Sequence, residues 1–154
     1  MGFFDKIKSA VNAVTGGGAK VTLEFQPTTG YAGDQVLAKI TVVATGNSEI
    51  KSKGMFIDLR SVEEVTVKKN VASTDHDIGV NHTTFEQEFQ IAPDFVLAAN
   101  ETKLFEGTLQ IPANVQPSYE GHFTQHRWEI RGRMEAFGND PDSGYLPFRV
   151  GMKM

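Results

Sequence analysis

Apolar and polar residues alternate with a period of two from residue 20 onward, and this pattern limits the folds open to the chain. In residues 21–26, Val21, Leu23 and Phe25 are separated by polar residues. The same alternation recurs in residues 36–44, 85–91, 105–111, 128–136 and 146–152. A period of two is typical of strands with one buried and one solvent-exposed face. Residues 50–71 add one or two further strands, so the sequence predicts about eight strands in all.

Turn residues separate these stretches, for example Gly46-Asn47 and Pro93-Asp94. No helical pattern of useful length lies between them. Strands joined directly by turns form antiparallel sheets, and this number of strands must close as a sandwich or a barrel. We therefore predict an all-β, immunoglobulin-like antiparallel β-sandwich, in one domain over residues 20–154. Gly132 lies inside a predicted strand, which indicates a bulge or a close packing contact.

The first fifteen residues follow a helical period instead. The apolar residues at this spacing are Phe3, Phe4, Ile7, Val11 and Val14. We predict a short N-terminal amphipathic helix over residues 1–15 and a glycine hinge over residues 16–19. Its apolar face is expected to contact a partner, the chain's own domain or a second copy of the chain. Contact with a membrane surface is the other interpretation, and it would be weak because the polar face has only two lysines and Asp5 offsets one.

Composition excludes several classes of function. The chain has 154 residues and no cysteine, which excludes disulfides, thiol catalysis and cysteine-based metal sites. Its net charge of −4 argues against a general nucleic-acid-binding protein, since such domains are usually basic. No apolar run approaches the ~18 residues needed to span a bilayer, and no secretory signal pattern occurs at the start. A cytoplasmic location is therefore expected.

Three stretches carry turn chemistry in a characteristic order. Residues 31–40 place a Gly-acidic pair before alternating apolar residues. Residues 104–112 end in an Ile-Pro step, and Pro117-Ser118-Tyr119 follows it. Residues 128–134 form the long strand after that turn. Together with Gly2-Phe3-Phe4 at the start, this order resembles the arrestin N-terminal domain, and most closely the bacterial sporulation-control (stage-zero sporulation protein M) family.

The resemblance implies an arrestin-like sandwich that binds other proteins and has no catalytic centre and no cofactor. Members of these families usually have two lobes, whereas this chain has the length for one. The Pro-Pro-x-Tyr signals that recruit ubiquitin ligases to arrestin-like proteins are absent from the sequence. The phosphate-sensing polar core of arrestins needs residues from both lobes, so none of it is carried over to this chain.

Two groups of histidines offer a metal-binding alternative. His122 and His126 have an HxxxH spacing, but on a strand they would lie about 13 Å apart, too far to share one ion. His76 and Asp77 could bind a divalent cation if His82 returned across a hairpin. They lie in a predicted polar connection between strands, where such residues are common without any ligand. These five residues would be the ligands of a small metal-binding protein or metal-assisted enzyme.

Three arginines share one face of a predicted strand. Arg127, Arg131 and Arg133 lie opposite the face of Trp128 and are interleaved with glutamates such as Glu129. They indicate either a docking stripe for an acidic or phosphorylated partner or a solvent-exposed face of salt bridges.

The sequence thus favours a non-catalytic regulatory or scaffolding module that binds a protein partner. Binding is expected through a sheet edge or face, with strand addition as the mode. The predicted contact residues are Phe3, Phe4, Ile7, Val11, Arg127, Arg131 and Arg133. An exposed edge also favours homo-oligomers, because unpaired strands tend to pair with one another. A metal-binding protein or a membrane-surface protein is the alternative.

Overall fold

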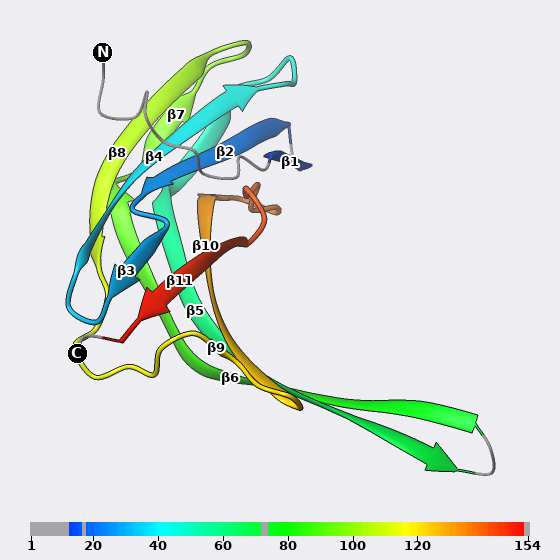
Figure 1. The fold of residues 1–154 in the computed structure, drawn as a ribbon. Coiled ribbons are helices and arrows are strands. Elements are labelled where there is room, and N and C mark those ends of the chain that lie inside the picture. The colour runs from blue at the N-terminus through cyan, green and yellow to red at the C-terminus, as the bar shows by residue number, and fades with distance from the viewer. Residues whose placement is uncertain (1–12, 17, 72–73, 153–154) are drawn as a thin grey trace.

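The computed structural model describes the backbone of residues 13–16, 18–71 and 74–152, with side chains outside 13–16 and 68–78. Within these residues the chain forms strands and no helix, arranged in two sheets (Figure 1). This confirms the predicted all-β class. The described part of the chain holds no helix of the length and apolarity needed to span a membrane.

The first sheet has four strands in the order β1-β2-β4-β8, all antiparallel. Its strands are β1 (Ala13–Gly16), β2 (Ala19–Gln26), β4 (Gln35–Ala44) and β8 (Thr102–Gln110). Burial in β4 alternates strictly, with Val36, Ala38, Ile40, Val42 and Ala44 buried. One face of this sheet therefore contributes to the core, as the period of two predicted.

The second sheet has seven strands, and its main path runs β3-β11-β10-β5-β6. The two short strands β7 and β9 pair with β5 and β10, respectively. The strands are β3 (Thr29–Tyr31), β5 (Ile50–Val71), β6 (Thr74–Ala92), β7 (Phe95–Leu97), β9 (Tyr119–Glu120), β10 (Thr124–Ala136) and β11 (Leu146–Gly151).

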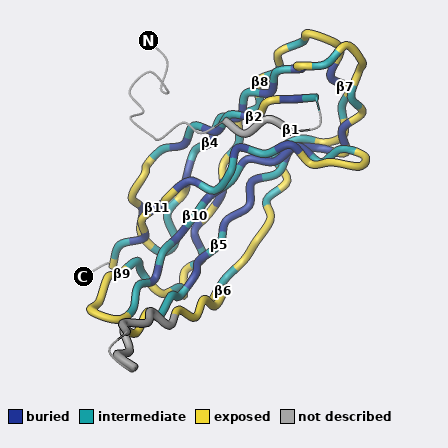
Figure 2. The backbone as a smooth tube through the Cα atoms, turned by 90° about the vertical axis from the view of Figure 1, so that its right-hand side faces the viewer, coloured by how far each residue is buried: buried dark blue, intermediate teal, exposed yellow. Residues whose placement is uncertain are grey.

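The core lies between the two sheets, where buried segments face one another (Figure 2). Leu23 and Ile40 come from the first sheet, and Leu59, Trp128 and Ile130 from the second. Gly132 confirms the predicted close packing contact, because a Cβ at this position would lie 3.1 Å from Ile40 Cδ1 of the facing sheet.

A long hairpin extends away from the sandwich (Figure 1). The last residue of β5 that pairs with β10 is Val65, opposite Thr124. Beyond it, β5 and β6 pair only with each other as far as Val71 and Thr74. Residues 50–71 are thus one strand of 22 residues. The segment predicted as a polar connection around His76 is strand, because cross-strand pairing with β5 supplies its backbone hydrogen bonds.

Two further predictions are corrected. The sandwich is not purely antiparallel, since β3 pairs with β11 in parallel at the sheet edge. Residues 13–16 are not the end of a helix followed by a hinge. They form β1, which pairs antiparallel with β2 from Gly16 opposite Ala19. The adjacent β2 offers a ladder of backbone hydrogen bonds at these positions, which outweighs local helical spacing.

Candidate functional site

A network of arginines and carboxylates covers the outer face of the second sheet. Arg131 Nη2 and Arg133 Nε on β10 lie 2.7 and 3.0 Å from Asp58 Oδ2 on β5. Arg133 Nη2 also donates to Glu88 Oε1 on β6 at 2.8 Å. Only 4% of the Asp58 side chain is exposed, so the two guanidinium groups compensate a carboxylate that has lost its water. Burial alone would lower the pKa of Arg133, but its hydrogen bond and ion pair with Asp58 raise it.

Arg127 extends this network along β10. It donates through Nη1 to Glu64 on β5, and through Nε to Glu129 Oε1 at 3.1 Å. Arg60 donates to the other oxygen of Glu129 at 2.8 Å. Hydrogen bonds from Gln125 and Arg127 hold the pKa of Glu64 below its usual value. Burial opposes the charge of Arg127, yet the bonds to Glu64 and Glu129 raise its pKa.

Tyr145 lies against two of these arginines. The guanidinium carbon of Arg60 is 3.6 Å from the centre of the Tyr145 ring, and that of Arg131 is 4.5 Å away. Such contacts are attractive because the face of an aromatic ring is electron-rich. Burial raises the pKa of the Tyr145 phenol, and the charges of Arg131 and Arg60 offset part of this effect.

The three predicted stripe residues therefore do share one face, and each is paired with carboxylates. Arg127 binds Glu64, while Arg131 and Arg133 bind Asp58. This arrangement is the salt-bridged face that was one of the two interpretations. A docking role for the stripe stays a prediction, and a partner there would have to compete with the internal carboxylates.

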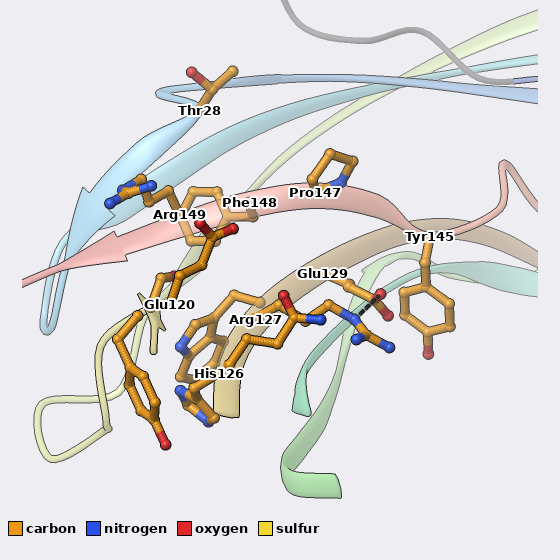
Figure 3. Close-up of a pocket in the computed structure, with 13 residues that line it drawn as sticks. Thr28, Glu120, His126, Arg127, Glu129, Tyr145, Pro147, Phe148 and Arg149 are labelled. Atoms are coloured by element: carbon orange, nitrogen blue, oxygen red, sulfur yellow. Dashed lines mark hydrogen bonds and ion pairs between the residues drawn. The ribbon is translucent and has the colours of Figure 1, made fainter. Parts of the chain in front are cut away.

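A cleft of about 310 Å³ opens where β10 and β11 separate (Figure 3). These strands pair only from Trp128 opposite Phe148 to Ile130 opposite Leu146. Beyond that point β11 pairs with β3, and β9 pairs with β10 in its place. The cleft is lined by aromatic, charged and hydroxyl side chains from β9, β10 and β11 and from the segments that precede β3 and β11.

His126 borders this cleft and is buried. Its Nδ1 lies 2.8 Å from the carbonyl oxygen of Pro117, which can only accept, so Nδ1 carries the proton. Its Nε2 lies 2.8 Å from Thr84 Oγ1, which in turn is 2.6 Å from Ser61 Oγ. The ring thus joins β6 and β10 to the segment before β9, and both of its nitrogens are already used. His126 has no lone pair left for a metal ion.

The other predicted metal ligands are not brought together. His122 is exposed in the turn between β9 and β10, where its ring contacts Phe123. His76, Asp77 and His82 lie along the single strand β6, so His82 does not return across a hairpin. The side chains of His76 and Asp77 lie outside the described residues. Among the described residues, no group of three or more metal-binding side chains forms.

Phe3, Phe4, Ile7 and Val11 all lie outside the described residues. Their role in partner or membrane binding stays a prediction.

Strand β6 forms one end of the second sheet, and among the described strands it pairs only with β5. Near its C-terminal end Ile91 packs against Gly107 of β8, where a Cβ would lie 2.7 Å from Ile91 Cγ2. Residues 83–90 precede this contact and leave the outer edge of β6 without a neighbouring strand in the described part of the chain. This stretch is long enough for a typical strand of about 5–6 residues to pair with it.

Sequence reasoning missed Asp58, Thr84, Tyr145 and Arg149. Asp58 had a usable signal, because Phe56, Asp58 and Arg60 alternate with buried apolar residues and so share the face of the arginines. Thr84, Tyr145 and Arg149 carry no such signal, because their neighbours come from segments far away in the sequence.

Comparison with solved structures places this arrangement among known folds. The crystal structure of Spo0M, the sporulation control protein from Bacillus subtilis, superposes with a TM-score of 0.61 over 87% of this chain. The fold is similar to that of about half of Spo0M. The likeness confirms the resemblance to the arrestin-like sporulation-control fold that the motif order indicated. Sequence identity to Spo0M is 18%, and the matched region is 49% of the Spo0M chain, so the protein spans about half of its length. No family model and no curated protein matches the sequence.

Proposed function

We propose that this protein is a non-catalytic regulatory module that binds a protein partner by strand addition at the outer edge of β6. The observation that carries the proposal is the stretch of residues 83–90, which has a strand on one side only among the described strands. A strand edge presents backbone donors and acceptors that a partner strand can satisfy. The Spo0M fold supports a regulatory role, since Spo0M is named as a sporulation control protein.

Charge along this edge indicates the kind of partner strand. Glu86 and Glu88 are exposed and lie on the same face of β6. Glu88 is paired with Arg133, whereas Glu86 makes no ion pair with a described residue. Two copies paired antiparallel around Gln87 would place Glu86 opposite Glu88, which like-charge repulsion disfavours. A partner strand with lysine or arginine facing Glu86 fits the edge better.

Affinity capture from the native host with the full-length chain tests the proposal. The partner identified by mass spectrometry is purified and titrated against wild type, Glu86→Lys and the matched control Glu106→Lys, which changes the same charge on the exposed face of β8. We expect Glu86→Lys to weaken binding several-fold, because it reverses one cross-strand ion pair, and Glu106→Lys to leave it unchanged.

Hydrogen exchange gives a second readout on the same complex. Binding by strand addition should slow amide exchange within residues 83–90, because the partner strand accepts hydrogen bonds from that edge. Protection confined to another strand, with full affinity in Glu86→Lys, would overturn the proposal.

A further inference from the structure

The cleft between β10 and β11 has an apolar floor made of side chains from the core. Trp128 and Phe148 line it although only 1% and 4% of their surfaces are exposed. Pro147 lines it from the same strand as Phe148 (Figure 3). A side chain that enters here meets aromatic residues that the core packs on their other sides. Trp128 is held by its Nε1, which donates to the carbonyl of Gln116 at 2.9 Å.

The rim of the cleft is polar and carries one uncommitted cation. Arg149 is exposed, and its guanidinium makes no hydrogen bond or ion pair with any side chain that the structure describes. Arg127, by contrast, is engaged by Glu64 and Glu129. Ser118 Oγ accepts from the backbone amide of Val150 at 3.0 Å, which leaves the hydroxyl proton of Ser118 free to donate.

We propose that this cleft binds a short acidic peptide segment, with one apolar side chain against Trp128 and Phe148 and a neighbouring carboxylate on Arg149. Its volume of about 310 Å³ is at the lower limit of ligand sites, about 300–1,000 Å³. It therefore accommodates one large side chain rather than a cofactor. Arginine matches a carboxylate with two parallel hydrogen bonds, which fixes the direction of the segment.

One acidic residue on the rim opposes such a ligand. Glu120 is exposed, lines the cleft and makes no ion pair within the described residues. Its charge repels the ligand carboxylate, so it reduces affinity without contributing to the apolar floor. Arg149 and Glu120 should therefore have opposite effects on binding, which a purely apolar cleft would not produce.

The site is independent of the proposed strand addition at β6. β6 and β11 lie on opposite sides of the central strands β5 and β10 in the same sheet. Variants at one location leave the other unchanged, so the failure of one proposal is distinguishable from the failure of the other.

Fluorescence of the full-length chain tests the proposal directly, because Trp128 is its only tryptophan. The probe is the peptide acetyl-Asp-Phe-Glu-amide. We expect a saturable change in Trp128 emission, at least about tenfold weaker binding for acetyl-Asn-Phe-Gln-amide, and no saturable response to acetyl-Asp-Gly-Glu-amide. A wild type that gives no saturable change with the first peptide would overturn the proposal.

Variants and one small molecule complete the test. Arg149→Gln should weaken binding of acetyl-Asp-Phe-Glu-amide about tenfold or more, and Glu120→Gln should tighten it. Lys20→Gln, an exposed site on β2 in the other sheet, should bind like wild type. Full affinity in Arg149→Gln would overturn the carboxylate contact. Binding of 3-phenylpropanoate as tight as that of the peptide would overturn the peptide assignment in favour of a small aromatic acid.

Discussion

Arg133 on β10 donates through Nε to Oδ2 of Asp58 on β5 at 3.0 Å, and only 10% and 4% of the two side chains are exposed. Removing one partner of a buried ion pair costs about 3 kcal/mol or more, and Asp58 is the least exposed of the carboxylates that pair with Arg133. We therefore expect Asp58→Asn to lower the free energy of unfolding by about 3 kcal/mol in urea denaturation.

The matched control for this prediction is Glu88→Gln, which removes a second carboxylate of Arg133 and leaves Asp58 and Asp140 in place. The Glu88 side chain is 64% exposed, so its removal should cost no more than about 1 kcal/mol. Equal stabilities of Asp58→Asn and Glu88→Gln would show that burial does not strengthen the Asp58 pair.

The Tyr145 phenol should resist ionisation in alkaline solution. Burial raises its pKa above the usual value of 10.0. Because the folded protein holds this proton more tightly than the unfolded chain does, the neutral Tyr145 phenol contributes to stability below the pKa that it has in the unfolded chain. That contribution is lost as the pH rises through the pKa that it has in the folded protein. Subtracting the absorbance titration of Tyr145→Phe from that of wild type should give a transition above pH 10. A difference transition at or below pH 10 would contradict burial as the dominant effect.

Thr84 should matter for stability although it is exposed. Its hydroxyl links His126 Nε2 and Ser61 Oγ. In Thr84→Val both partners lose this bond, and an unsatisfied buried polar group costs about 1–3 kcal/mol. Thr84→Ser keeps the hydroxyl and serves as the control. We expect a lower melting temperature for the valine variant alone. Equal melting temperatures of Thr84→Val and Thr84→Ser would argue against a stabilising link from His126 through Thr84 to Ser61.

Gly132 should not tolerate a methyl group. A Cβ there would lie 3.1 and 3.2 Å from the Ile40 side chain, and overpacking of this kind costs about 1–3 kcal/mol. At Gly79 a Cβ would approach only the Val65 carbonyl oxygen, at 3.9 Å. Thermal unfolding should therefore show a clear loss for Gly132→Ala and little change for Gly79→Ala. An unchanged melting temperature in Gly132→Ala would mean that Ile40 moves aside at no cost in stability.

The N-terminal segment is expected to bind lipid only weakly. Two lysines and one offsetting aspartate give little attraction to anionic vesicles. In flotation with vesicles of phosphatidylcholine and phosphatidylglycerol, most of the full-length protein should stay with the unbound fraction. Changing Phe3 and Phe4 to Ser should lower the small floated fraction further. Strong flotation that survives both substitutions would remove these residues as the membrane contact.

Much of the candidate surface could be predicted from the alternation in β10. Trp128, Ile130 and Met134 are buried, and the arginines between them lie on the opposite face, as their parity required. The pairing of those arginines could not be predicted, because Asp58 is more than seventy positions away in the chain. Its contact with Arg131 depends on the register between β5 and β10, which no local pattern specifies.

The histidines show the same limit. The argument from strand geometry assumed that His122 and His126 lie on one strand, whereas His122 lies in the turn before β10 and only His126 is on the strand. Both ring nitrogens of His126 are hydrogen-bonded, one to Thr84 and one to Pro117. These bonds depend on two other segments that fold around the histidine. Sequence reasoning also placed residues 74–77 and His82 in a polar connection, because their polar composition hid a strand that only pairing with β5 reveals.

By itself, the sequence determined the all-β class, the buried face of most strands and the order of motifs shared with the sporulation-control fold. Side-chain direction along a strand repeats every two residues, so it can be read from neighbours in the chain. Tertiary structure alone decided the parallel pairing of β3 with β11, the edge of β6 that no described strand covers, and the cleft beside Trp128. Each of these depends on which strands pair and where they diverge, and that choice is made by the packing of the whole sandwich rather than by any local stretch.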